Sequence, residues 1–137
     1  SVQKAQDFSA TDLAKICWAF AKFDYVDQAE DFWAAMEKEV PRKIHSGKFV
    51  DLSMTVWAFG QAEVGGEMMY REIAKASLSM MRELPPQSLA NIAWSFARRG
   101  VSDPELFAAI AARARGLVSD FVEFDVSNLC WALARAD

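Results

Sequence analysis

The chain has little of what a metal centre or a membrane protein requires. Its 137 residues include one histidine, His45, and two cysteines, and these residues do not have the spacing of metal ligands. No apolar run approaches the roughly 20 residues that a membrane-spanning helix needs. Asp and Glu (19) outnumber Lys and Arg (15), so the net charge is −4 and no basic field covers the whole surface. The sequence predicts no metal site and no transmembrane segment.

Recognisable catalytic motifs are also lacking. With only 6 glycines, the chain has no Gly-rich loop that could hold a phosphate group. It has no nucleophile paired with a base and no pair of catalytic carboxylates. We therefore expect a non-enzyme without a cofactor.

The two cysteines, Cys17 and Cys130, each precede a tryptophan by one position. Three repeats of the pattern described next separate them, and helices pack roughly 8–10 Å apart, so they cannot reach disulfide distance. We expect two buried, reduced thiols, as in a reducing compartment.

The chain does contain a pattern that occurs four times. In each copy a tryptophan is followed by Ala or Ser and then by Phe or Leu; the copy Leu-Ala-Asn-Ile-Ala-Trp-Ser-Phe-Ala starts at Leu89. The tryptophans Trp18, Trp57, Trp94 and Trp131 are 39, 37 and 37 positions apart. A fixed period of this length is typical of repeat architectures.

Each copy predicts a first helix. The residue six before each tryptophan is a good helix cap: Asp12, Asp51, Ser88 and Asp125, with Ser9 as an alternative in the first copy. We expect helices from these caps to four or five residues after each tryptophan, about residues 12–22, 51–61, 88–98 and 125–135. Gly100 then suits a left-handed C-terminal cap.

A second helix is expected after each of the first three. Asp103 with Pro104 gives the clearest start, Asp27 with Glu30 a capping pattern, and Gly65-Gly66 a turn before Glu67. Pro41 predicts a helix end near Val40 and a short extra turn to Gly47, and Gly116 ends the third of these helices. No sustained alternation predicts a strand.

Together these helices predict one all-α domain over residues 1–137, an α-solenoid of about three and a half antiparallel helix pairs. The repeats span approximately 9–47, 48–85, 86–122 and, as a half repeat, 123–137. Ala or Gly three after each tryptophan allows close helix approach, and we expect the aromatic residues to belong to the core. The last helix has no second partner, which favours a longer parent chain or a docked partner.

The pattern around Trp94, followed by Gly100 and Ser-Asp-Pro-Glu-Leu-Phe from Ser102, resembles the octotricopeptide and heptatricopeptide repeats of organellar proteins. These repeats are often found ahead of a RAP domain in algae and alveolates. The resemblance implies a location in a mitochondrion or plastid. It also implies work on organellar RNA, in its maturation or translation or in ribosome assembly.

A candidate binding surface follows from the positions three before, one after and four after each tryptophan. Their residues are polar or small, while acidic residues collect on the second helices. With Arg99 added, the stripe carries five positive and no negative charges, as a groove for single-stranded RNA needs. The candidates are Lys15, Lys22, Gln61, Asn91, Ser95, Arg98, Arg99, Asn128 and Arg135.

Two other interpretations stay open. Lys22, Arg98 and Arg135 lie near helix C-termini, where the helix dipole favours a cation without any ligand, so the stripe can be a solvated face. Alternatively, the protein is a structural or assembly subunit, docked by protein contacts in a large organellar complex such as a mitoribosome or a photosynthetic or respiratory complex.

Overall fold

The computed structural model describes residues 8–23 and 30–136. Within them the chain is all-helical. The α-helices are α1 (Ala10–Lys22), α2 (Glu30–Lys43), α3 (Phe49–Ala62), α4 (Glu67–Ser79), α5 (Pro86–Arg99), α6 (Pro104–Arg115) and α7 (Glu123–Arg135). Three short 3₁₀ helices lie before α3, α5 and α7: η3 (Ile44–Ser46), η4 (Met81–Glu83) and η5 (Val118–Asp120).

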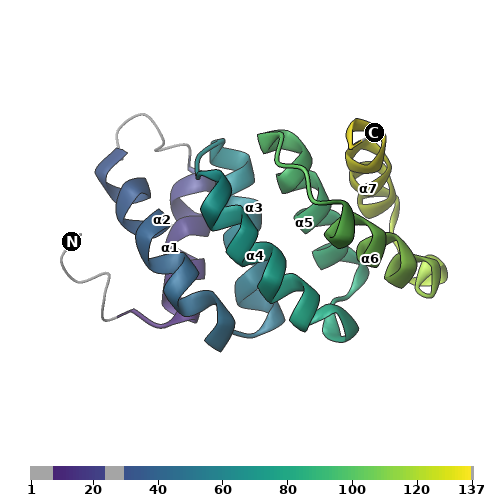
Figure 1. Ribbon diagram of the computed structural model, residues 1–137, viewed down its shortest axis with the longest axis horizontal. Helices are drawn as coiled ribbons and strands as arrows, with labels where there is room; N and C mark the ends of the chain where they lie inside the picture. The colour runs from purple at the N-terminus through teal and green to yellow at the C-terminus, as the bar shows by residue number, and fades with distance from the viewer. Residues whose placement is uncertain (1–7, 24–29, 137) are drawn as a thin grey trace.

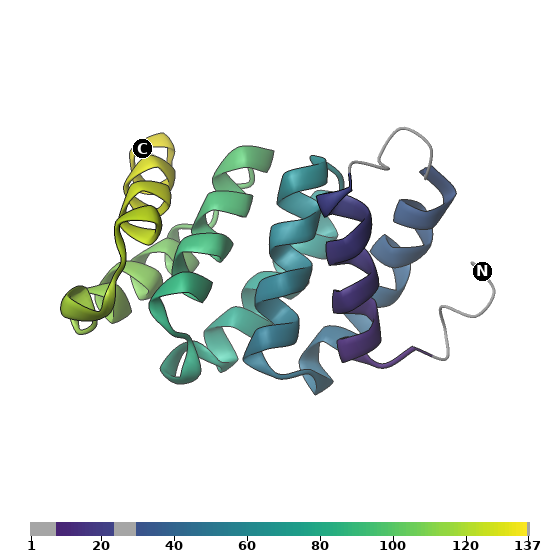
Figure 2. The same ribbon diagram turned by 180° about the vertical axis from the view of Figure 1, so that it is seen from behind.

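The helices form two layers (Figure 1). The first layer contains α1, α3, α5 and α7, which carry the four repeated tryptophans and pack against one another in chain order. Figure 2 shows this row from its own side. The second layer contains α2, α4 and α6, which also contact one another in order. The pair α1 and α2 stands at one end of the molecule and α7 at the other.

Several helix ends match the sequence predictions. Asp103 caps α6 by accepting the amide of Leu106 at 3.0 Å, and Pro104 occupies the first turn. Gly100 ends α5 with φ of 72°, and the amide of Val101 donates to Phe96 at 3.0 Å. Gly65, with φ of 98°, lies in the turn before α4. The expected cap Asp27 lies outside the described residues.

The predicted caps of the first-layer helices were wrong by one turn, except for the alternative cap Ser9 of α1, which is confirmed. The other predicted caps are the third residues of their helices and not N-caps: Asp12, Asp51, Ser88 and Asp125. The N-cap of each helix lies three residues before them. The carboxylates of Asp12 and Asp51 reach back and accept the amides of Ser9 (3.1 Å) and Lys48 (2.9 Å). A capping box places an acidic residue at this position, and sequence alone does not separate it from the cap.

The prediction for Pro41 was also wrong in part. α2 continues through Pro41 to Lys43, because a proline in the last turn removes only one hydrogen bond from the helix. The expected extra turn follows as η3 and ends at Gly47. Equivalent 3₁₀ turns precede α5 and α7, so this turn belongs to every repeat and not to the first alone.

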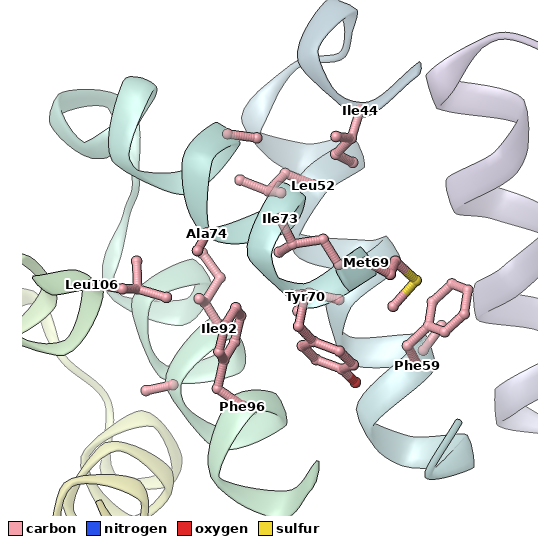
Figure 3. Close-up of a cluster of buried hydrophobic side chains, with 14 of the residues drawn as sticks. Ile44, Leu52, Phe59, Met69, Tyr70, Ile73, Ala74, Ile92, Phe96 and Leu106 are labelled. Atoms are coloured by element: carbon pink, nitrogen blue, oxygen red, sulfur yellow. The ribbon is translucent and has the colours of Figure 1, made fainter. Parts of the chain in front are cut away.

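The core lies between the two layers. Figure 3 shows its centre, where Met69, Tyr70 and Ile73 of α4 meet Phe59 of α3 and Phe96 of α5. Tyr70 and Phe96 meet edge to face with ring centroids 5.1 Å apart. Trp33 of α2 meets Phe59 in the same way, also at 5.1 Å. α2 and α4 thus each place an aromatic ring on the next first-layer helix, and burial of one such side chain contributes about 1.5–3 kcal/mol.

The first-layer helices approach one another through small residues. A Cβ atom added to Gly60 of α3 would lie 2.9 Å from the Cα and 2.7 Å from the Cβ of Ser95 in α5. By the same helix positions Ala21 pairs with Ala58 and Ala97 with Ala132, and all four alanines are buried. The prediction that the position three after tryptophan allows close approach is therefore confirmed at Gly60.

The expectation that the aromatic residues belong to the core was wrong for Trp18, Trp94 and Trp131, whereas Trp57 is partly buried and packs against the core. Trp18, Trp57 and Trp94 are only half-buried, and Trp131 is 40% exposed. One helical residue turns by about 100°, so the residue two after tryptophan points roughly opposite to it. That residue, Phe59 or Phe96, faces the second layer, and the indole therefore lies on the outer side of the first layer.

The thiol prediction holds for one cysteine only. Cys17 is fully buried, and burial raises the pKa of its thiol above its usual value. Cys130 is free but exposed. The equivalent residues Val56 and Ala93 are buried on the flank that faces the next first-layer helix, and no helix follows α7 within the described residues.

We predict that Gly60→Ala destabilises the protein. The added methyl group meets the backbone of Ser95, and such overpacking costs about 1–3 kcal/mol, more than the gain of at most ~1 kcal/mol in helix propensity. Urea unfolding measures the effect. The control is Gly116→Ala, where the nearest atom is 3.6 Å from the added Cβ and no loss is expected. Equal stability of the two variants would contradict the close approach of α3 and α5.

Candidate nucleic-acid interface

The side of the first layer that faces away from the second layer is called the outer face here. On each first-layer helix it carries the tryptophan and the residues three before and four after it. These three positions lie within about 60° of one another around the helix axis, since one residue turns by about 100°. The helices run side by side, so the outer face is one continuous surface (Figure 2).

An aromatic groove of about 410 Å³ runs across the outer face. Trp18 of α1 and Trp57 of α3 lie in it with ring centroids 6.3 Å apart. Asn91 of α5 and Phe124 of α7 belong to the same groove, so four helices contribute to it. Its remaining lining residues are Phe49, Val50, Ser53, Met54, Pro85, Gln87 and Ser88. Flat rings with adjacent hydroxyl and amide groups suit a planar, hydrogen-bonding ligand.

Three of the four tryptophans have a cation over the ring. Lys22 lies 4.6 Å from the ring centroid of Trp18, Arg98 lies 5.2 Å from Trp94, and Arg135 lies 4.9 Å from Trp131. In each pair the cation comes four residues later, one helical turn along the same face. In the second repeat Gln61 occupies this position, which leaves the indole of Trp57 without such a cation.

The other predicted residues differ in accessibility. Lys15 and Gln61 are exposed, and Asn91 and Asn128 are half-buried. The side-chain amide of Asn91 donates to the hydroxyl of Ser53 at 3.5 Å and so links α5 to α3. Arg98 also forms an ion pair with Glu63 at 3.2 Å. The exposed members of the predicted set therefore lie on the outer face, although none of them lines the groove.

Two predicted residues lie elsewhere. Ser95 is fully buried against Gly60, and the equivalent residues Ala58 and Ala132 are buried in the same way. The position one after tryptophan therefore belongs to the contact between helices and not to an exposed stripe. Arg99 is half-buried and donates to the carbonyl oxygens of Glu63 (2.9 Å) and Gly65 (2.8 Å), so it holds the turn between α3 and α4.

Sequence reasoning missed the tryptophans as site residues. Three copies have a Lys or Arg four residues after the tryptophan. This spacing places a cation over the indole ring, which indicates an exposed ring. It went unused because a repeated tryptophan usually indicates a core position. The groove residues Phe49, Val50 and Phe124 carry no such signal, since they lie together only after the four helices have packed.

The described helices contain none long and apolar enough to cross a membrane. Residues 8–23 and 30–136 hold no group of His, Cys, Asp and Glu side chains that could bind a metal ion. Comparison of the chain with protein-family models and with curated proteins finds no match. The geometry of the outer face thus carries the functional argument.

We predict that the neighbouring arginines Arg98 and Arg99 have different roles. Arg99→Ala leaves two carbonyl oxygens of the α3–α4 turn without their donor and lowers the free energy of unfolding by about 1–3 kcal/mol. Arg98→Ala removes an exposed ion pair and changes it by no more than about 1 kcal/mol. Denaturant titration of both variants distinguishes the roles, and an equal loss in both would contradict them.

Proposed function

We propose that the protein is a non-catalytic helical-repeat module that binds single-stranded RNA on its outer face. On this proposal the two layers form a right-handed α-solenoid of about three and a half repeats, and the protein acts in a mitochondrion or plastid. RNA maturation, translation or ribosome assembly is the process that the sequence resemblance suggests. The observation that carries the proposal is the groove with Trp18 and Trp57, which lies on the same face as the exposed cations Lys22, Arg98 and Arg135.

The chemistry of the groove fits unpaired bases. Base stacking on an aromatic side chain contributes about 1–3 kcal/mol per base and needs a ring that is accessible on one face. Trp57 offers such a ring, and among the described residues no cation is stacked over it, since Gln61 stands four residues later. The amide of Asn91 and the hydroxyl of Ser53 lie in the same groove and can hydrogen-bond to base edges.

The charge distribution fits the phosphate backbone in spite of the net charge of −4. Lys22, Arg98 and Arg135 are exposed on three different helices of the outer face. The carboxylates of Glu67 and Glu72 lie on the second layer, where they pair with Arg71 and Lys75. An acidic protein can thus present positive charge on one side.

We predict that single-stranded RNA binds with an affinity that falls with salt. Three phosphate contacts give a slope near −2 in log affinity against log salt, so the affinity falls roughly 20-fold between 50 and 200 mM. Fluorescence anisotropy of a labelled oligouridine measures this. The triple variant Lys22→Ala, Arg98→Ala, Arg135→Ala weakens binding roughly 10- to 100-fold at 50 mM salt and flattens the slope.

The control removes three exposed cations from the second layer: Lys38→Ala, Arg71→Ala and Lys75→Ala. This variant has the same net charge as the first triple variant, so a purely global electrostatic effect would weaken both equally. We expect it to bind RNA as the unchanged protein does. Equal weakening in the two variants, or no binding by the unchanged protein at 50 mM salt, would contradict RNA contact through the outer face.

A second candidate function is that of a structural subunit, and the α7 end of the molecule favours it. Val118, Val122, Phe124 and Val126 are between 44% and 71% exposed there, next to the exposed Trp131. An exposed cluster of large apolar side chains is a usual mark of a protein contact.

This candidate predicts that the intact protein co-purifies with other proteins in fixed stoichiometry and that Val126→Asp removes them. The control is Met68→Asp, which places an acid at an 84% exposed methionine on the second layer and should leave the complex intact. Quantitative mass spectrometry after affinity purification measures both. Recovery of RNA without stoichiometric proteins would exclude the subunit function.

A further inference from the structure

The turn between α3 and α4 contains a seat for an arginine side chain. The guanidinium of Arg99 donates from Nη1 to the carbonyl oxygen of Glu63 and from Nη2 to that of Gly65, at 2.9 and 2.8 Å. Burial raises the pKa of the Tyr70 phenol, and the charge of the nearby Arg99 lowers it by a smaller amount. The seat thus combines two backbone acceptors with an aromatic wall.

A turn of the same length occurs one repeat later, between α5 and α6, but Ser102 does not share the positive φ of Gly65 (98°). Gly100 takes the place of Glu63, and both are left-handed, with φ of 72° and 56°. The amides of Val101 and Val64 donate back to Phe96 and Phe59 at 3.0 and 3.1 Å. By this equivalence the carbonyl groups of Gly100 and Ser102 correspond to those that hold Arg99.

The side chains that fill the seat are smaller in the later repeat. Ala136 stands where Arg99 would be, Leu133 replaces Phe96, and Phe107 replaces Tyr70 and lacks its hydroxyl group. Within residues 8–23 and 30–136, no side chain donates a hydrogen bond to Gly100 or Ser102. A pocket of about 310 Å³ remains, lined by Ala97, Gly100, Val101, Ser102, Asp103, Pro104, Phe107, Leu133, Arg135 and Ala136.

The lining of this pocket carries one charge of each sign. Asp103 takes the place of Gly66 and adds a carboxylate to the lining; its Oδ1 accepts the Leu106 amide at 3.0 Å. The other charged residue of the lining is Arg135, whose guanidinium lies over Trp131 at 4.9 Å from the ring centroid. The pocket therefore offers a negative charge, backbone carbonyl groups and the apolar wall of Phe107 and Leu133.

We propose that this pocket binds an arginine side chain of a partner protein. The guanidinium donates to the carbonyl groups of Gly100 and Ser102, as Arg99 does to Glu63 and Gly65, and pairs with Asp103. The methylene stem lies against Leu133 and Phe107. A lysine does not replace it, because a single ammonium group lacks the fixed fork that reaches two carbonyl oxygens. This site lies apart from the aromatic groove and does not depend on RNA binding.

The first arm of the test fills the pocket with a side chain of the protein itself. Ala136→Arg restores the residue that the preceding repeat has, and we expect the melting temperature to rise by roughly 3–6 °C. Ala136→Lys adds the same charge without the fork and should raise it by less than half as much. An Ala136→Arg variant that is no more stable than Ala136→Lys overturns the proposal.

The second arm uses N-acetylarginine amide as the probe, with N-acetyllysine amide as its matched control. In two-dimensional NMR spectra of the intact protein, the arginine compound should give saturable shifts of the amides around Gly100, Ser102 and Phe107. Neither the lysine compound on the unchanged protein nor the arginine compound on Ala136→Arg should give them. Equal shifts from the two compounds, shifts retained in Ala136→Arg, or no shifts at all would overturn the proposal.

Discussion

The structure depends on how closely the first-layer helices approach one another. At Gly60 the distance is so short that a Cβ atom would meet the backbone of Ser95, and the equivalent contacts use alanine on both sides. Only small residues allow this spacing, so α3 and α5 each have a neighbouring first-layer helix on both flanks. The residue two after tryptophan points to the second layer and fills the core. A large ring at the tryptophan position then has one direction left, which is outward.

Much of the fold could be predicted from the sequence because its signals are local. The period near 37 can be read directly from the sequence. The cap at Asp103 with Pro104 and the left-handed Gly100 depend only on residues within one helical turn. The failures came from contacts between helices. Apolar character does not distinguish a residue that faces the second layer, such as Phe96, from one that faces outward, such as Trp94. Both are large apolar residues, and only the packing of the neighbouring helices decides which way each side chain points.

Equivalent residues at the two ends of the first layer differ in burial. Cys17 and Cys130 occupy equivalent helix positions, yet one is buried and the other exposed, because α3 covers the flank of α1 and no helix follows α7 in the described chain. Ala134, which corresponds to the buried Ala97, is exposed for the same reason. Whether a residue is buried therefore depends on whether its repeat has neighbours on both sides, and the repeat pattern alone does not show this.

The cations stacked on the tryptophans do not block a base from the outer face. An exposed cation–π contact contributes about 0.5–1 kcal/mol, whereas stacking of a base contributes about 1–3 kcal/mol. A base that displaces Lys22 from Trp18 therefore gains more than the contact it breaks, and the freed ammonium group can pair with a phosphate. Trp57 needs no such exchange because Gln61 stands four residues after it. On the proposed binding mode, Trp57 is consequently the ring that a base occupies first, and the cation-covered tryptophans follow.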